Sequence, residues 1–221
     1  MTADLQTKYL KDYRPPGHLI DSIALHVELA PEKTRVRARL QVRDNPAASE
    51  PPGCLCLHGR KLGLLHVLLD GRELRGHEYA LDDEGMTIPG PPASFVLETL
   101  VEINPQANTA LEGLYRASDI YCTQCEAEGF RKITFFPDRP DVMTRFTTTL
   151  VGDVDNTPIL LANGNLIDSG GLEGRQHFAT FEDPFPKPSY LFALVAGDLR
   201  HVEEEFTTMS GRAVRLRIYV K

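Results

Sequence analysis

Residues 121–131 form the part of this sequence that is best suited to binding chemistry. The segment is polar and compact, and it lies inside a chain that mostly alternates between apolar and polar residues. Gln124 and Glu126 are two residues apart, so in an extended backbone both side chains point to the same side. A carboxylate supplies charge and an amide supplies a hydrogen bond, and together they can bind an ammonium group. The alternative interpretation is a structural loop whose polar side chains are satisfied locally.

The sequence contains no complete metal-binding helix motif. A His-Glu-x-x-His helix would place two imidazoles on one face and a glutamate beside them to activate water. The most similar string begins at His77 and Glu78, but it lacks the second histidine. We interpret it as the exposed edge of a strand.

Four cysteines are the other candidates for metal or redox chemistry. Cys54, Cys56 and His58 alternate along one predicted strand and could share a face, while Cys122 and Cys125 form a C-x-x-C. The spacing of the first set is unusual for zinc, and no thioredoxin-like pattern surrounds the second. We interpret all four as reduced cysteines, most simply buried ones, without a metal or redox role.

The remaining charged motifs indicate local structure. Asp153 and Asp155 precede Asn156 as a loose acidic pair, which is typical of a turn held by side-chain caps. Alternating arginines in residues 35–39 and 215–217 indicate solvated strand faces. No nucleophile elbow and no phosphate-binding loop is present in the sequence.

Composition and charge argue against several classes of function. The chain has 221 residues, of which 42% are hydrophobic and 25% are charged, as expected of a globular protein. Its net charge of −7 argues against binding nucleic acid or an anionic membrane surface. No apolar run approaches the length of a membrane span, and residues 1–13 are too polar for a signal peptide. We therefore expect a cytoplasmic protein without nucleic-acid or membrane partners.

Period-two alternation dominates the sequence and predicts an all-β fold. Residues 25–29 and 36–40 alternate around a turn and predict a hairpin, and Asp70-Gly71 predicts a two-residue hairpin turn. Short strands with frequent turns indicate a sandwich or saddle-like double sheet of mainly antiparallel strands. Residues 106–141 have few repeating apolar positions and predict one long irregular loop. We expect no helix longer than a turn or two.

Several strings in the chain resemble the N-terminal domain of zinc aminopeptidases of the gluzincin metallopeptidase family. The resemblance covers the whole chain, and the run from Thr123 to Asp141 is its most specific part. The strings are Leu111–Tyr115, Thr123–Arg131, Phe136–Val142, Asn163–Asn165 and Asp183–Phe192.

This resemblance implies a function for the polar segment. It implies that residues 1–221 form a single β-rich domain in front of a catalytic domain of the same chain, which holds the zinc. The intact enzyme would be a zinc metalloaminopeptidase of broad specificity that releases N-terminal amino acids from peptides. Glu126 would bind the α-amine of the substrate and Gln124 would line the pocket for the first side chain. The resemblance also implies a cis peptide bond between Glu126 and Ala127.

The resemblance implies that the catalytic residues and zinc ligands lie outside these 221 residues, so the chain alone should be inactive and bind no metal. We expect an apolar surface where the catalytic domain docks.

Three other functions remain open on the sequence. A non-catalytic scaffold or interaction module could keep the same fold, although such proteins lose the amine-binding carboxylate. A related epoxide hydrolase would carry a glutamine in place of Glu126. Composition alone would also support a freestanding β-sandwich binding module.

Overall fold

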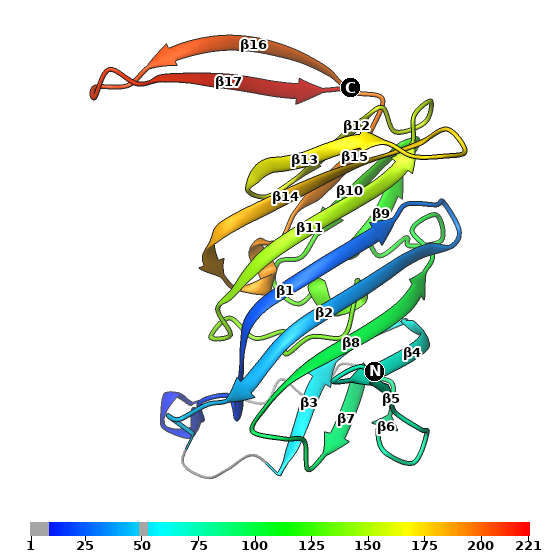
Figure 1. Cartoon of the computed structure of the whole chain (residues 1–221), viewed down its shortest axis with the longest axis vertical. Coiled ribbons are helices and arrows are strands. Elements are labelled where there is room, and N and C mark those ends of the chain that lie inside the picture. The colour runs from blue at the N-terminus through cyan, green and yellow to red at the C-terminus, as the bar shows by residue number, and fades with distance from the viewer. Residues whose placement is uncertain (1–8, 49–52) are drawn as a thin grey trace.

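The computed structural model describes residues 9–48 and 53–221, and these form an all-β protein (Figure 1). The predicted class of short, mainly antiparallel strands is confirmed. Within the described residues no helix is long and apolar enough to cross a membrane. Over the same residues the helical elements are three single turns, η1 (Leu10–Asp12), η2 (Phe130–Lys132) and η3 (Ser189–Leu191).

The largest element of the fold is a sheet of eight strands. β1 and β11 pair in parallel at its centre, and the other neighbours pair antiparallel. In sheet order the strands are β13 (Asn165–Gly171), β14 (Gln176–Lys187), β11 (Thr144–Asp153), β1 (His18–Glu28), β2 (Thr34–Asp44), β8 (Ser94–Ile103), β4 (Gly63–Leu69) and β5 (Arg72–Glu73).

Two smaller sheets share a hydrophobic core with this long sheet. Figure 1 shows them behind it, one towards each end. Buried residues from all three sheets belong to one hydrophobic cluster, which gives the predicted sandwich arrangement. The first consists of β12 (Ile159–Ala162), β15 (Leu194–Gly197), β10 (Ile120–Gln124) and β9 (Gly113–Ala117), and the second of β3 (Cys54–His58), β7 (Gly85–Pro89) and β6 (Ala80–Leu81).

The long sheet has one apolar and one charged face because its strands alternate. In β2, residues 34, 36, 38, 40 and 42 are all buried, whereas the arginines between them are exposed. Arg35 lies 3.8 Å from Glu102, and Arg39 lies 3.4 Å from Glu98 across the strand pair with β8. The predicted hairpin and its solvated arginine face are therefore confirmed.

The prediction of a continuous irregular loop over residues 106–141 is wrong in part. Residues 113–124 form the antiparallel strands β9 and β10, and Ser118 turns the chain between them with φ 57°. The hairpin lacks the expected alternation because β9 has only two adjacent buried residues and β10 only one, Tyr121. Residues 125–143 form no strand: they contain a turn over residues 126–129, the helical turn η2 and one isolated bridge from Phe136 to His58.

Phe130 anchors this irregular segment in the core. Its side chain is fully buried, and its ring makes edge-to-face contacts with three other phenylalanines. The ring centroids lie 5.2 Å from Phe136, 5.8 Å from Phe146 in β11 and 5.2 Å from Phe192. Such aromatic pairs stabilise a fold beyond the area they bury, so the start of η2 is fastened to the long sheet.

A buried ion pair lies beside this aromatic cluster. Arg131 and Asp138 each have only 5% of their surface exposed. The Arg131 side chain donates from Nε to Asp138 Oδ2 over 3.0 Å and from Nη2 to the Asp138 carbonyl over 3.0 Å. The Arg131 amide and the Ser189 hydroxyl also donate to the Asp138 carboxylate. The pair has the additional hydrogen bonds that a desolvated charge requires.

His58 connects the ion pair to the smaller sheet. Its Nδ1 accepts a hydrogen bond of 3.0 Å from the Asp138 amide, and its backbone bonds to Phe136 in both directions. Burial lowers the pKa of His58, and the nearby Arg131 lowers it further. The ring is therefore held neutral, with Nδ1 as the acceptor.

The hairpin of β16 (Arg200–Thr207) and β17 (Ala213–Val220) stands apart from the body of the protein (Figure 1). One face pairs Val202 with Ile218 and Phe206 with Val214. The other carries charged residues, including Glu203, which contacts two arginines. The apolar face is mostly exposed, with Val202 and Ile218 both at 65%.

Replacing Asp138 with Asn should destabilise the protein by about 3 kcal/mol, because the Arg131 charge would lose its buried counter-charge and keep only the exposed Glu128. Urea unfolding followed by circular dichroism measures this change. Asp168→Asn is the matched control, since Asp168 is exposed on β13, and it should change the unfolding free energy by less than roughly 0.5 kcal/mol. Equal effects of the two substitutions would contradict a stabilising role for the ion pair.

Lowering the pH from about 7 to 5 should destabilise the protein through His58. The unfolded chain protonates this histidine near its ordinary pKa of 6.5, whereas the folded state holds the pKa lower. The contribution of His58 to stability is therefore fully present above the unfolded-state pKa of 6.5 and is lost as the pH falls through the lower pKa of the folded state. Urea midpoints at pH 7.5 and 5.5 measure the loss, which should be smaller in His58→Asn, a side chain that accepts a hydrogen bond without titrating. His18, whose pKa burial also lowers, remains in both proteins and accounts for the residual loss. An equal loss in the variant would rule His58 out.

Candidate functional site

The polar segment singled out from the sequence forms a tight turn at the end of β10. Gln124 is the last residue of that strand, and the Gly129 amide donates to the Cys125 carbonyl over 2.8 Å to close the turn. The chain then enters η2 at Phe130. The turn, residues 124–129, therefore lies between a paired strand and an anchored phenylalanine.

Gln124 and Glu126 lie on the outer side of this turn. Cys125 between them is 3% exposed, and its burial raises the pKa of its thiol to about 12. Gln124 and Glu126 are both exposed. The Gln124 side-chain nitrogen donates to the Glu126 carbonyl over 3.2 Å, and the Glu126–Ala127 peptide bond is cis. The two side chains considered for ammonium binding are thus adjacent and open to solvent.

The carboxylates around the turn differ in their partners. Glu128 lies 3.2 Å from Arg131, and Glu112 forms an ion pair with Lys132. Lys132 lowers the pKa of Glu112 through this contact. Glu126 has no hydrogen-bond or ion-pair partner for its carboxylate among the described residues. Glu126 is therefore the carboxylate of this turn that can bind a cationic ligand without first breaking an ion pair.

Two glycines allow the turn to pack against β9. A Cβ on Gly129 would lie 2.2 Å from the Gln124 carbonyl oxygen, and one on Gly113 would lie 2.9 Å from the Gly129 carbonyl oxygen. Gly113 also has φ 73°, which side-chain-bearing residues rarely adopt. Any larger residue at either position would push the turn away from the strand.

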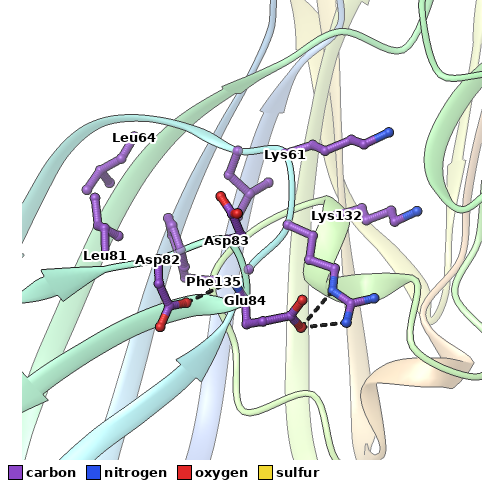
Figure 2. A pocket seen from close by; sticks show the side chains of 11 residues that line it. Lys61, Leu64, Leu81, Asp82, Asp83, Glu84, Lys132 and Phe135 are labelled. Carbon is purple, nitrogen blue, oxygen red and sulfur yellow. Dashed lines mark hydrogen bonds and ion pairs between the residues drawn. The ribbon is translucent and has the colours of Figure 1, made fainter. Parts of the chain in front are cut away.

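A charged cleft lies on the far side of η2. Its volume is about 920 Å³, and the Arg60 amide connects it to η2 by donating to the Arg131 carbonyl over 2.9 Å. The Arg60 guanidinium donates to Glu84. Figure 2 shows Lys61 and Lys132 extending to one side of this cleft. Two of the three cations, Arg60 and Lys132, are thus neutralised by glutamates. The cleft offers an open, mixed-charge surface, and its lining contains no Ser, Thr, Cys or His side chain.

Two other motifs from the sequence have structural roles. His77 and Glu78 lie in a turn, whereas Ala80 and Leu81 at the end of the same string form the exposed edge strand β6, so the interpretation as a strand edge holds only for the end of the string. The Glu78 carboxylate accepts from Arg72 and from the Arg75 amide, which lowers its pKa to about 2. Asp153 caps its own turn by accepting from the amides of residues 155 and 156, so its predicted role is confirmed.

The residues present do not fit a catalytic zinc ion. Such sites use three protein ligands and an open position. Residues 9–48 and 53–221 contain no group of three or more His, Cys, Asp or Glu side chains placed to hold a metal. His58 uses Nδ1 to accept from Asp138, and the buried Cys125 thiol resists deprotonation. No chemical step can therefore be assigned to a zinc ion held by these residues.

The ion pair that supports the turn was not found by sequence patterns. Arg131 and Asp138 are seven residues apart in an irregular segment, and Ser189 is 51 residues further on. No periodicity links them. The only signal was that all three lie in the strings of the family resemblance.

The comparisons with known proteins agree with that resemblance. Residues 16–191 match the family model of the peptidase M1 N-terminal domain. The chain is 51% identical over 215 residues to an aminopeptidase N from Caulobacter vibrioides, covering 97% of this chain and 24% of that protein. It is 46% identical over 221 residues to the aminopeptidase N of Escherichia coli K12, covering 100% of this chain and 25% of that protein. The chain thus spans about a quarter of the length of these relatives.

Solved structures show the same fold. Aminopeptidase A from Legionella pneumophila, in complex with aspartic acid, superposes with a TM-score of 0.90 at 32% identity over 96% of this chain and 25% of that one. A mutant M1 zinc metallopeptidase from Deinococcus radiodurans, bound to a Tyr-Ser-Ala substrate, gives 0.75 at 17% identity over 91% of this chain and 47% of that one. The second likeness supports the fold alone. The match over residues 16–191 and the two curated relatives show that this chain belongs to the peptidase M1 N-terminal domain family.

Proposed function

We propose that this chain is the substrate-recognising N-terminal part of a zinc aminopeptidase of broad specificity. The observation that carries the proposal is the exposed Glu126 carboxylate, for which the described part of the chain provides no cation, whereas Glu128 in the same turn and Glu112 beside it are both paired. Relatives at 51% and 46% identity carry the name aminopeptidase N, which supports the assignment.

A fixed carboxylate explains how such an enzyme would distinguish a chain end from an internal peptide bond. A free α-amine is a cation at neutral pH and can donate charge-assisted hydrogen bonds to Glu126. A blocked or internal residue brings no charge and would leave the carboxylate desolvated without a partner. Sites of this kind reject analogues that lack the polar group. Glu126 therefore supplies the selectivity for N-termini.

Gln124 would line the pocket for the first side chain of the peptide. Its Nε2 donates to the Glu126 carbonyl, which leaves the amide oxygen free to accept from a ligand. A neutral amide does not select strongly for or against charged side chains, which is in keeping with a broad range of first residues. The Legionella relative was solved with aspartic acid, an amino acid that carries a free amine.

Hydrolysis itself we assign to a catalytic domain of the same chain. The zinc ligands would lie there, outside residues 1–221, and these residues would form one β-rich domain that donates the Glu126 turn to the active site. The apolar face of the β16–β17 hairpin supports this arrangement, because Val202, Phe206 and Ile218 are exposed there. Such surfaces mark docking sites.

A cytoplasmic location is in keeping with the cysteines. Cys54, Cys56, Cys122 and Cys125 are free thiols, and free thiols are maintained in reducing compartments. We place the enzyme there and propose peptides as its substrates.

Glu126→Gln in the full-length, zinc-loaded protein should lower kcat/KM on an alanine-derived chromogenic substrate by about 100-fold, or roughly 3 kcal/mol, because the amine would lose its counter-charge. Glu128→Gln is the matched control, an exposed carboxylate in the same turn that already pairs with Arg131. It should change kcat/KM by less than about threefold.

Full activity of Glu126→Gln would contradict the role of this residue. An inactive wild-type protein would instead favour the non-catalytic scaffold with the same fold. The two outcomes separate the site assignment from the enzyme assignment.

Gln124→Ala should change the ranking of substrates more than the overall rate. We expect the ratio of kcat/KM values between alanine- and leucine-derived substrates to shift by about tenfold, since a pocket contact is worth about 1–3 kcal/mol. Because both substrates are measured on the same sample, differences in folding or zinc content cancel in the ratio. A uniform loss on both substrates would place Gln124 outside the side-chain pocket.

A further inference from the structure

The outer face of the small sheet β3–β7–β6 carries two adjacent thiols. Cys54 and Cys56 alternate with Leu55 and Leu57, which are buried in the core beneath. Cys56 is exposed, Cys54 is half-buried, and their sulfur atoms lie 3.5 Å apart. β3 is the edge strand of its sheet, and the bridge on its outer side is at its last residue, His58, away from Cys54. None of these residues contributes to the Glu126 turn.

The separation of the two sulfurs matches that of a bent chelate. A metal with S–metal bonds of about 2.3 Å to sulfurs this far apart would have an S–metal–S angle of about 100°, which is near tetrahedral. A linear two-coordinate ion would need the sulfurs more than roughly 4 Å apart. The geometry favours zinc or cadmium over copper(I).

Without a metal, the surroundings of the pair favour the protonated thiols. Cys56 pairs in register with Thr87 of β7. Burial and the neighbouring Cys54 raise the pKa of the Cys56 thiol, and a hydrogen bond with Thr87 opposes that rise. A bound divalent cation would remove the repulsion between the two thiolates that keeps them protonated. Since His58 already accepts from the Asp138 amide, the pair offers two protein ligands, and water would complete the coordination.

The geometry points to a surface metal site in this protein, a two-thiolate chelate of Cys54 and Cys56 for a soft divalent d10 cation of the zinc and cadmium type. The site shares no residue with the Glu126 turn. Two ligands from a rigid strand bind without ordering a loop, but two are fewer than a structural zinc site uses. We therefore expect exchangeable binding that depends on both sulfurs.

Titration with Cd²⁺ tests the proposal, because thiolate-to-cadmium charge transfer absorbs in the ultraviolet. The full-length protein is reduced and passed over a chelating resin, and then titrated beside Cys54→Ser, Cys56→Ser and Cys122→Ser. The third variant is the matched control, since Cys122 is also a half-buried cysteine. Wild type and Cys122→Ser should bind one equivalent more than Cys54→Ser and Cys56→Ser, whose affinity at this site should fall at least tenfold. Iodoacetamide labelling read by mass spectrometry should show that Cd²⁺ protects Cys54 and Cys56 but not Cys122.

The proposal is overturned if wild type and the two serine variants give the same titration, or if only one of the two serines matters, since a chelate needs both sulfurs. Circular dichroism of each variant confirms that the comparison is made between folded proteins. The proposal is also overturned if Cd²⁺ does not reduce the iodoacetamide labelling of Cys54 and Cys56, even if a serine variant binds Cd²⁺ poorly. Activity plays no part in these measurements, so the result is independent of the aminopeptidase assignment.

Discussion

The buried ion pair of Arg131 and Asp138 is the interaction on which the rest of this region depends. It lies where three parts of the chain meet: the irregular segment itself, β3 through His58, and η3 through Ser189. A desolvated ion pair is not stabilising in itself, because both charges have left water. The ion pair instead fixes the position of the segment, because its hydrogen bonds can all form in only one arrangement of the chain. A purely apolar contact could hold the segment equally tightly but would tolerate shifts along the sheet.

Beside that closed network lies one carboxylate, Glu126, for which the described residues provide no cation or hydrogen-bond donor. Glu112 and Glu128 are neutralised by Lys132 and Arg131, and Cys125 is held as a buried thiol. Glu126 lies among these satisfied groups with its carboxylate exposed. The turn thus combines a backbone fixed by buried partners with a side chain that has none, which is the arrangement that preorganised binding sites require. The cysteines show the same division, since Cys125 is buried and unreactive whereas Cys54 and Cys56 are accessible.

Sequence reasoning succeeded where a local pattern decides the structure. The β1–β2 hairpin follows from strict alternation, and the turn at Asp70 and Gly71, with φ values of 49° and 78°, follows from residue type. It failed for β9 and β10, which bury too few residues to alternate clearly. It could not find the partnership of Arg131, Asp138 and Ser189, because side chains brought together by tertiary folding leave no periodic signal. The placement of Gln124 and Glu126 on the same side of the chain was predictable from their spacing, but the buried supports beneath them were not.

The parallel pairing of β1 with β11 has a consequence for how the protein is made. Ser22 lies opposite Arg145, so this parallel seam of the long sheet joins residues 22–28 to residues 145–151, which are far apart in the sequence. While the ribosome is still synthesising the residues between β8 and β11, β1 can pair with β2, and β2 with β8, but one edge of β1 stays unsatisfied. That edge is an open template for any other extended peptide, including a second nascent copy. Closing so distant a contact is slow, so the nascent chain should need chaperone protection until β11 has left the exit tunnel.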